Sequence, residues 1–175
     1  MPDRLSVPGR TLSAMTTDPQ LTAWLDQEDA RLAQLIRAHR WTVQYVWQGE
    51  QPDEPAFGYT IGLFGLGHPE LVVVGLDPVV TNQVLEHAAG LVADGRDLVA
   101  GELVTGPGNR PGLVVEELPN PGEVLLGANR FYERPAEYSV PAYQLAWPDD
   151  DGRWPWDDGF RWGSEAQPRP GTWRA

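Results

Sequence analysis

Residues 41–76 constrain the fold most strongly, because three strand-like segments follow one another there with short connections. Residues 41–48 (WTVQYVWQ) are rich in aromatic and β-branched side chains, and residues 57–63 (FGYTIGL) alternate large with small side chains, so both are predicted to be strands. Residues 70–76 (ELVVVGL) are almost continuously apolar, which is typical of a strand buried on both faces of a sheet. The segment therefore predicts three strands: a polar loop at 49–55 joins the first two, and a tight turn at 64–69 joins the second to the covered third strand.

Two helices are predicted around this group of strands, and each begins at an Asp-Pro pair, at 18–19 and 77–78. Proline is favoured in the first turn of a helix, where its missing N–H costs nothing. Over residues 21–39 the apolar side chains recur every three or four positions, as in an amphipathic helix. The second helix is predicted to end at Gly95. These stripes indicate two main helices that pack on a sheet.

The rest of the chain completes a single predicted domain. Residues 98–104, 112–118 and 141–147 are predicted strands, and residues 127–138 a short helix; residues 123–126 are ambiguous. We expect an α+β fold in which a mostly antiparallel, curved sheet or incomplete, split-barrel-like barrel is flanked by the two main helices. Residues 1–17 are predicted to be a disordered leader, 18–162 the domain and 163–175 an irregular tail. Five of the eight tryptophans lie between positions 147 and 173, so residues 148–162 should stay attached although they lack regular structure.

Composition excludes several classes of function. The chain has no cysteine and no lysine, and its formal net charge is −12, which disfavours nucleic-acid binding and removes lysine chemistry and thiolate metal sites. Residues 149–151 and 157–158 are aspartate-rich, but their spacing does not fit a calcium loop, and we expect no metal site. There is neither a signal-peptide core nor an apolar run of membrane-spanning length, so the expected location is cytoplasmic, with no membrane partner. No G-x-S-x-G or G-x-G-x-x-G motif suggests a nucleophile or a dinucleotide site.

The candidate binding residues cluster around the second and third predicted strands. His68 and Glu70 flank a proline; they either act as an acid–base or cation-binding pair, or His68 caps the turn and Glu70 begins an edge strand. Tyr59 and Thr60 point to opposite faces of one strand, so one should face the core and the other a groove or solvent. The glycines at positions 58, 62, 65 and 67 leave space beside these side chains, and either a neighbouring group or a ligand should fill it.

A second group of candidates follows Gly127. Arg130 and Tyr132, together with Asn129, lie at the start of the predicted short helix. A helix N-terminus with a nearby arginine can bind an anion, although a plain surface helix has the same pattern. The predicted ligand-binding set is therefore Tyr59, Thr60, His68, Glu70, Arg130 and Tyr132, and no catalytic residue is assigned.

Two segments carry a family resemblance. GYTIGLFGLGHPELVVVGL (58–76), with its Gly-His-Pro-Glu-Leu turn, and the late QLAWPDDDGRWPWDDGF (144–160) resemble the domain of unknown function 4262 (DUF4262) family over about residues 20–160. The resemblance implies a bacterial, cytoplasmic protein and brings no activity with it. The order of elements is also similar to flavin-reductase-like split barrels, where the segment between two strands helps to hold a flavin phosphate.

Two functional hypotheses follow. The first is a non-catalytic binding or regulatory module that presents an acidic, tryptophan-rich surface to a protein partner. The second is a protein or enzyme that binds a small molecule, such as a flavin or another anionic cofactor, around Tyr59, Thr60, His68, Glu70 and Arg130. A symmetric homodimer is also expected, since this is the commonest closed assembly.

Overall fold

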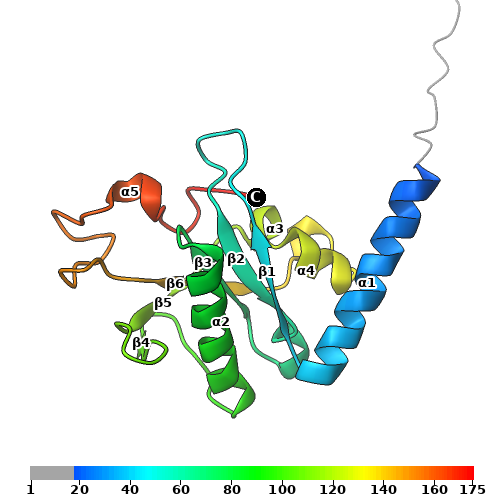
Figure 1. The fold of residues 1–175 in the computed structure, drawn as a ribbon, viewed down its shortest axis with the longest axis horizontal. Helices are drawn as coiled ribbons and strands as arrows, with labels where there is room; N and C mark the ends of the chain where they lie inside the picture. The colour runs from blue at the N-terminus through cyan, green and yellow to red at the C-terminus, as the bar shows by residue number, and fades with distance from the viewer. Residues whose placement is uncertain (1–17) are drawn as a thin grey trace, which may run out of the picture.

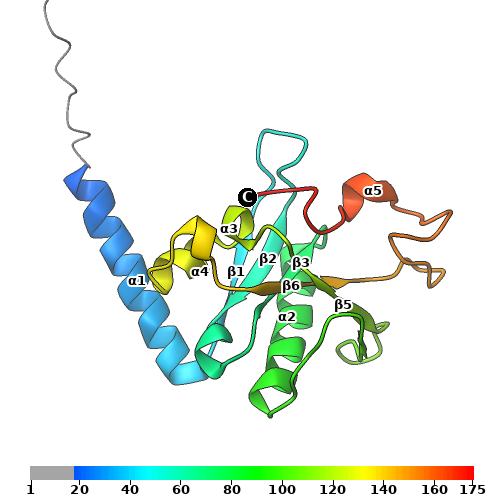
Figure 2. The ribbon, with the colours of Figure 1, turned by 180° about the vertical axis from the view of Figure 1, so that it is seen from behind.

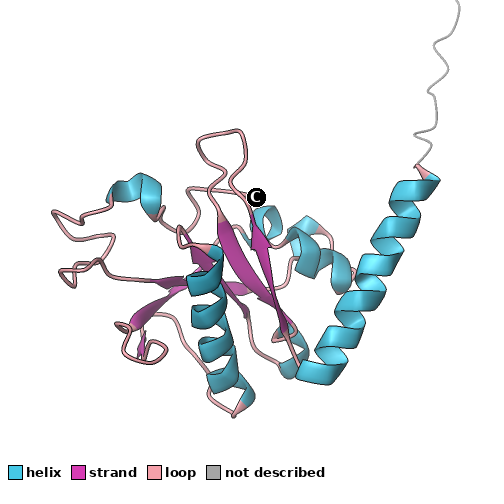
Figure 3. Ribbon diagram, viewed as in Figure 1, coloured by secondary structure: helices cyan, strands magenta, loops and turns pink. Residues whose placement is uncertain are grey.

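The computed structural model describes residues 18–175, which form an open six-stranded sheet with helices on both faces (Figure 1). The predicted leader, residues 1–17, lies outside the described residues. The strands are β1 (Thr42–Val46), β2 (Phe57–Ile61), β3 (Glu70–Val74), β4 (Leu103–Val104), β5 (Leu113–Glu117) and β6 (Ala142–Ala146). The helices are α1 (Pro19–His39), α2 (Pro78–Ala93), α3 (Pro121–Val124), α4 (Leu126–Phe131) and α5 (Gly163–Ala166), with 3-10 turns η1 (Phe64–Leu66) and η2 (Ala136–Tyr138) (Figure 3). None of the helices in this described part is long and apolar enough to cross a membrane.

The strands follow the order β1-β2-β3-β6-β5-β4. Only β3 and β6 run parallel to each other, and the other four pairings are antiparallel. The prediction of a single α+β domain with a mostly antiparallel sheet is confirmed, and the sheet stays open instead of closing into a barrel. The reading of Glu70 as the start of an edge strand is wrong, because β3 lies between β2 and β6.

Layers on both sides bury the centre of the sheet. The helix α2 packs on one face, where Leu71 and Val73 of β3 point into its core cluster (Figure 1). Val72 and Val74 point to the opposite face, which α3, α4 and the C-terminal end of the chain cover (Figure 2). Every residue of β3 is buried, which confirms the prediction of a strand covered on both sides.

The first helix, α1, contacts the domain only along part of its length. Asp18 caps it by accepting a hydrogen bond from the amide of Gln20, as the Asp-Pro start predicts. Leu32 and Ile36, in its second half, pack against the core, whereas Leu21 and Trp24 are about half exposed. The predicted apolar stripe is therefore buried against the domain only in the second half of α1.

Several predicted elements are shorter than expected. Of the predicted strand at 98–104, only Leu103–Val104 pairs, because Gly101 turns the chain with φ +91°. The predicted helix at 127–138 ends at Phe131, and Pro135 separates it from η2, since a proline disfavours helical backbone before it. Residues 163–175, predicted to be an irregular tail, contain α5 and bury the side chains of Gln167 and Trp173.

Candidate functional site

Glu70 is the centre of a buried hydrogen-bond network at the start of β3. Its carboxylate is fully buried and accepts bonds from the Thr60 hydroxyl (2.6 Å) and from the amides of Gly62 (2.9 Å), Phe64 (3.1 Å) and Leu63 (3.3 Å). Burial raises the pKa of the Glu70 carboxyl, while the Thr60 hydroxyl and the three amides oppose that shift. Because these four donors occupy the oxygens, the carboxylate holds the β2–β3 connection together.

His68 is also committed to contacts within the chain. It is 4 % exposed; its Nδ1 donates to the carbonyl of Pro69 (2.7 Å) and its Nε2 accepts from the amide of Leu98 (3.1 Å). This pattern requires a neutral ring with its proton on Nδ1. The imidazole therefore connects the turn before β3 to the segment after α2 through hydrogen bonds.

We expect His68→Ala to lower the free energy of unfolding by about 1–3 kcal/mol, because it leaves a buried amide without its acceptor. Urea unfolding followed by circular dichroism measures the loss. The matched control is His39→Ala, since His39 is exposed at the end of α1 and its replacement should leave stability nearly unchanged. Equal stabilities of the two variants would show that the imidazole bonds do not contribute to the fold.

The two tyrosine hydroxyls lie on the same side of the molecule as Glu70 and also have internal partners. Tyr59 donates to the Gln44 side chain and accepts from the amide of Gly127, both at 3.0 Å. Tyr132 accepts from the amide of Gly65 at 3.3 Å. Burial, with a contribution from the charge of Glu70, raises the pKa of each tyrosine to about 12.

The expectation that either Tyr59 or Thr60 faces a groove or solvent is wrong. Both side chains are buried, because α2 covers one face of β2 and α4 lies over the other. The space beside the glycines is filled by the chain itself at two of them: a Cβ on Gly58 would lie 2.4 Å from Thr81 of α2, and one on Gly62 would lie 2.4 Å from the Arg40 carbonyl. Close packing accounts for these two glycines.

Arg130 is paired with a carboxylate of the first helix. Its Nε and Nη2 donate to Asp29 Oδ2 at 3.2 and 2.8 Å, which joins α4 to α1. An anion at this guanidinium would have to compete with that ion pair. The structure thus gathers the predicted residues Thr60, His68, Glu70, Tyr59 and Tyr132 around β2 and the start of β3, with Arg130 on α4. Most of their polar atoms already form hydrogen bonds within the chain.

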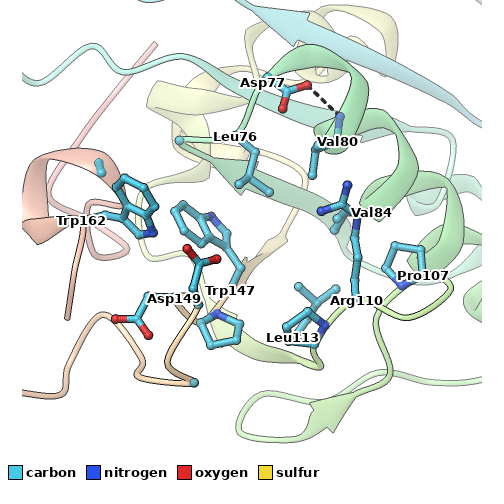
Figure 4. Close-up of a pocket in the computed structure, with 16 residues that line it drawn as sticks. Leu76, Asp77, Val80, Val84, Pro107, Arg110, Leu113, Trp147, Asp149 and Trp162 are labelled. Carbon is cyan, nitrogen blue, oxygen red and sulfur yellow. Dashed lines mark hydrogen bonds between the residues drawn. The ribbon is translucent and has the colours of Figure 1, made fainter.

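A cavity of about 670 Å³ lies at the opposite end of β3 (Figure 4). It opens where β3 and β6 finish: residues 75–77 follow β3, and residues 147–150 follow β6. Because these two strands are parallel, their carboxyl ends meet at the same edge of the sheet, which is where open sheets with parallel strands commonly bind ligands. Its apolar walls come from Leu76, Val80, Val84, Leu113, Trp147 and Trp162, and we name it the Trp147 cavity.

Trp147 is held rigidly at the base of this cavity. Its indole Nε1 donates to the carbonyl of Val74 (2.9 Å), so it bridges the ends of β6 and β3. The buried Gln167 side chain accepts from the Trp147 amide (2.9 Å) and donates to its carbonyl (2.7 Å). Phe160 packs beside the indole, with ring centroids 6.1 Å apart. Both the indole and its backbone are therefore preorganised.

Asp149 organises the loop that forms the outer wall. The side chain is 3 % exposed and accepts bonds from the amides of Asp151 and Arg153 (both 2.9 Å) and Arg161 (2.8 Å). Burial alone would raise the pKa of this carboxyl, but the three amides outweigh it and hold the pKa below its ordinary value. This loop, predicted to remain attached without regular structure, buries Asp149 and partly buries Trp154, while Trp156 and Trp162 stay about half exposed.

The polar groups at the Trp147 cavity suit binding better than chemistry. Among the described residues that line it are Asp77, Asp149, Asp150 and Arg110, and no histidine, serine, threonine, tyrosine or lysine. Two of the aspartates accept backbone amides and the third pairs with an arginine, so no carboxylate is poised beside a second catalytic group. The cavity offers apolar area, two indoles and one guanidinium.

The chain is a small α+β domain with a cavity at the carboxyl ends of its two parallel strands. The chain belongs to the family described as Domain of unknown function (DUF4262), which matches residues 35–161, more than half of the chain. The two resembling segments lie in neighbouring strands, since β3 and β6 pair with Val72 opposite Gln144. No curated protein and no solved structure matches the chain at a significant level.

Sequence reasoning missed the Trp147 cavity. The signal was present in the way both parallel strands end: β3 runs into Leu-Asp-Pro at 76–78 and β6 into Trp-Pro-Asp at 147–149. Nothing in the sequence states that these strands are neighbours, so the two motifs could not be placed together.

Proposed function

We propose that this chain is a non-catalytic binding protein that holds a small, largely apolar organic molecule in the Trp147 cavity. The observation that carries the proposal is a cavity of about 670 Å³ whose base is fixed by the bonds of Trp147 to Val74 and Gln167. Small-molecule sites commonly have this size, with apolar walls and few polar groups. Because the base is preorganised, binding should require little ordering of the chain.

A neutral, polarity-sensitive naphthalene dye (prodan) tests this proposal, and Val80→Trp is the decisive variant. Val80 lines the cavity in the first turn of α2, so an indole there should occupy the ligand space. We expect the dye to show blue-shifted, enhanced emission with the wild-type chain and to bind about tenfold more weakly, or not at all, to Val80→Trp. Fluorescence titration at fixed ionic strength measures both affinities.

Val79→Trp is the matched control, because Val79 immediately precedes Val80 on the same helical turn but is 66 % exposed and does not line the cavity. It adds the same indole to the protein without filling the pocket, and should bind the dye as the wild type does. Equal dye binding by Val80→Trp and the wild type, with both folded, would contradict the proposal.

Recognition of a protein partner is the second candidate. The observation in its favour is that Trp156, in the acidic C-terminal segment, is 45 % exposed and does not line the cavity, and exposed aromatic side chains often anchor protein interfaces. The same pair of variants separates the candidates, because a partner bound to that outer surface should not respond to an indole placed at position 80.

A further inference from the structure

We propose that the ligand of the Trp147 cavity is an apolar monocarboxylate, and that Arg110 anchors its carboxylate. This inference rests on the proposed function and assigns the chemical class of the ligand. The apolar part would lie against Trp147, Val84 and Leu113, and the carboxylate would meet the guanidinium.

Among the described arginines that have no carboxylate partner, Arg110 is the one that lines the cavity. Of the described residues that line the cavity it is the one basic side chain, and its guanidinium donates a long bond, 3.4 Å, to the neutral side chain of Gln83. Most other arginines in the described part of this acidic chain pair with an aspartate or glutamate: Arg31, Arg96, Arg130, Arg153, Arg161, Arg169 and Arg174. With a formal net charge of −12 carboxylates are abundant, so an arginine that meets none of them at a cavity indicates a ligand that supplies one.

The aspartates at the cavity, in contrast, already have partners. Asp77 caps α2 by accepting the amides of Val79 (2.9 Å) and Val80 (3.0 Å) through Oδ1. Asp149 accepts three amides of its own loop, and Asp150 pairs with Arg161 at 3.2 Å. A cationic ligand would meet carboxylates that already accept bonds from this chain, whereas an anionic ligand meets a guanidinium that lacks a carboxylate.

The loop that carries Arg110 is built to hold it in place. The Arg110 amide donates to the Pro107 carbonyl (3.0 Å), and prolines at 107 and 111 restrict the backbone on both sides. Gly106 packs against Pro111 across the loop: a Cβ at position 106 would lie 2.0 Å from the Pro111 carbonyl oxygen, so only glycine allows this close approach. In Figure 4 the Arg110 side chain extends from this loop toward Val84 of α2. The guanidinium thus stands beside the apolar wall that would hold the rest of the ligand.

The same geometry disfavours a phosphate. The N-terminus of α2 lies at the cavity, but Asp77 already accepts its amides at Val79 and Val80, so they are not free to bind a dianion. A second negative charge on the ligand would also add to the repulsion from Asp77, Asp149 and Asp150 without gaining another guanidinium. One guanidinium matches one carboxylate, which it can bind through two parallel hydrogen bonds.

Four naphthyl compounds of similar size test the inference by displacement of the neutral dye: naphthylacetate, its methyl ester, naphthylethylamine and naphthyl phosphate. We expect naphthylacetate to bind the wild-type chain about tenfold more tightly than the ester and the amine, and more tightly than the phosphate. Arg110→Gln should remove this preference, and should weaken naphthylacetate far more than the ester or the dye. Arg110→Lys, which keeps the charge but not the planar fork, should retain only part of it. Calorimetry provides an independent measure.

Arg96→Gln is the control for the loss of one positive charge, because Arg96 pairs with Glu102 outside the cavity; the preference for naphthylacetate should survive it. Arg110 is exposed, so circular dichroism should show its variants folded; if Arg110→Gln does not fold, Arg110→Lys decides the question alone. Binding of the ester, amine or phosphate to the wild type as tight as that of naphthylacetate would overturn the inference while the proposed function stands. A preference that persists in Arg110→Gln, or that is undiminished in Arg110→Lys, would overturn it in the same way. If neither the dye nor any naphthyl compound binds, the proposed function itself fails.

Discussion

Replacement of Glu70 by alanine is expected to lower the free energy of unfolding by about 3–5 kcal/mol, a large share of the stability of a domain of this size. The cause is the loss of the acceptor shared by the Thr60 hydroxyl and the amides of Gly62, Leu63 and Phe64. These donors lie where water cannot easily replace the carboxylate, since Glu70 and Thr60 are fully buried. Each unsatisfied buried donor costs about 1–3 kcal/mol. Urea unfolding at neutral pH measures the effect.

Two further variants separate the hydrogen bonds from the loss of volume. Glu70→Gln keeps the size but turns one acceptor oxygen into a donor, so it should remain clearly destabilised. Glu117→Ala is the control, because Glu117 is an exposed glutamate at the end of β5. The assignment of Glu70 to the fold would be wrong if Glu70→Gln unfolded like the wild type. A Glu70 variant with normal stability that loses ligand binding would instead support the binding role predicted from the sequence.

Trp173→Ala is expected to cost about 3–5 kcal/mol, although the residue lies only two positions from the C-terminal end of the chain. Its indole is 2 % exposed, packs on Phe57 with ring centroids 4.8 Å apart, and donates to the Gln144 side chain at 3.0 Å. The Trp173 carbonyl also accepts from Asn120 at 2.8 Å. Removal of the indole therefore leaves a cavity over β2 and an unpaired, buried carbonyl oxygen on the Gln144 side chain.

Trp162→Ala is the comparison for this result, because the same side chain is removed from a position that is 48 % exposed. It should change the stability by less than about 1 kcal/mol, as most surface substitutions do. The melting temperature and the urea midpoint should both fall for Trp173→Ala only. Equal effects of the two substitutions would mean that the C-terminal residues do not complete the core.

The candidate site shows where sequence patterns succeed and where they stop. His68 and Glu70 are sequence candidates because they flank a proline at a tight turn, and Thr60 because glycines leave space beside it. The structure does bring Thr60 and Glu70 into direct contact. Polar residues at a tight turn are also found where a buried carboxylate binds the amides of that turn. Residue types alone do not show whether the hydrogen-bonding atoms are already paired within the chain or are free to bind a ligand. The sequence around Arg130 predicts a helix start that could bind an anion. It could not reveal that the guanidinium pairs with Asp29, which is 101 residues away in the chain.

Much of the secondary structure could be predicted because it depends on neighbouring residues. Alternation of large and small side chains placed β2, and a nearly continuous apolar run placed β3. The Asp-Pro pairs placed the starts of α1 and α2, because capping is a local property of the chain. The open sheet and the parallel pairing of β3 with β6 were decided only by packing. That pairing joins residues about seventy positions apart, and many strand orders would bury the same apolar faces equally well. The tertiary structure alone therefore brings the end of β3, the Trp147 segment and the Arg110 loop together around one cavity.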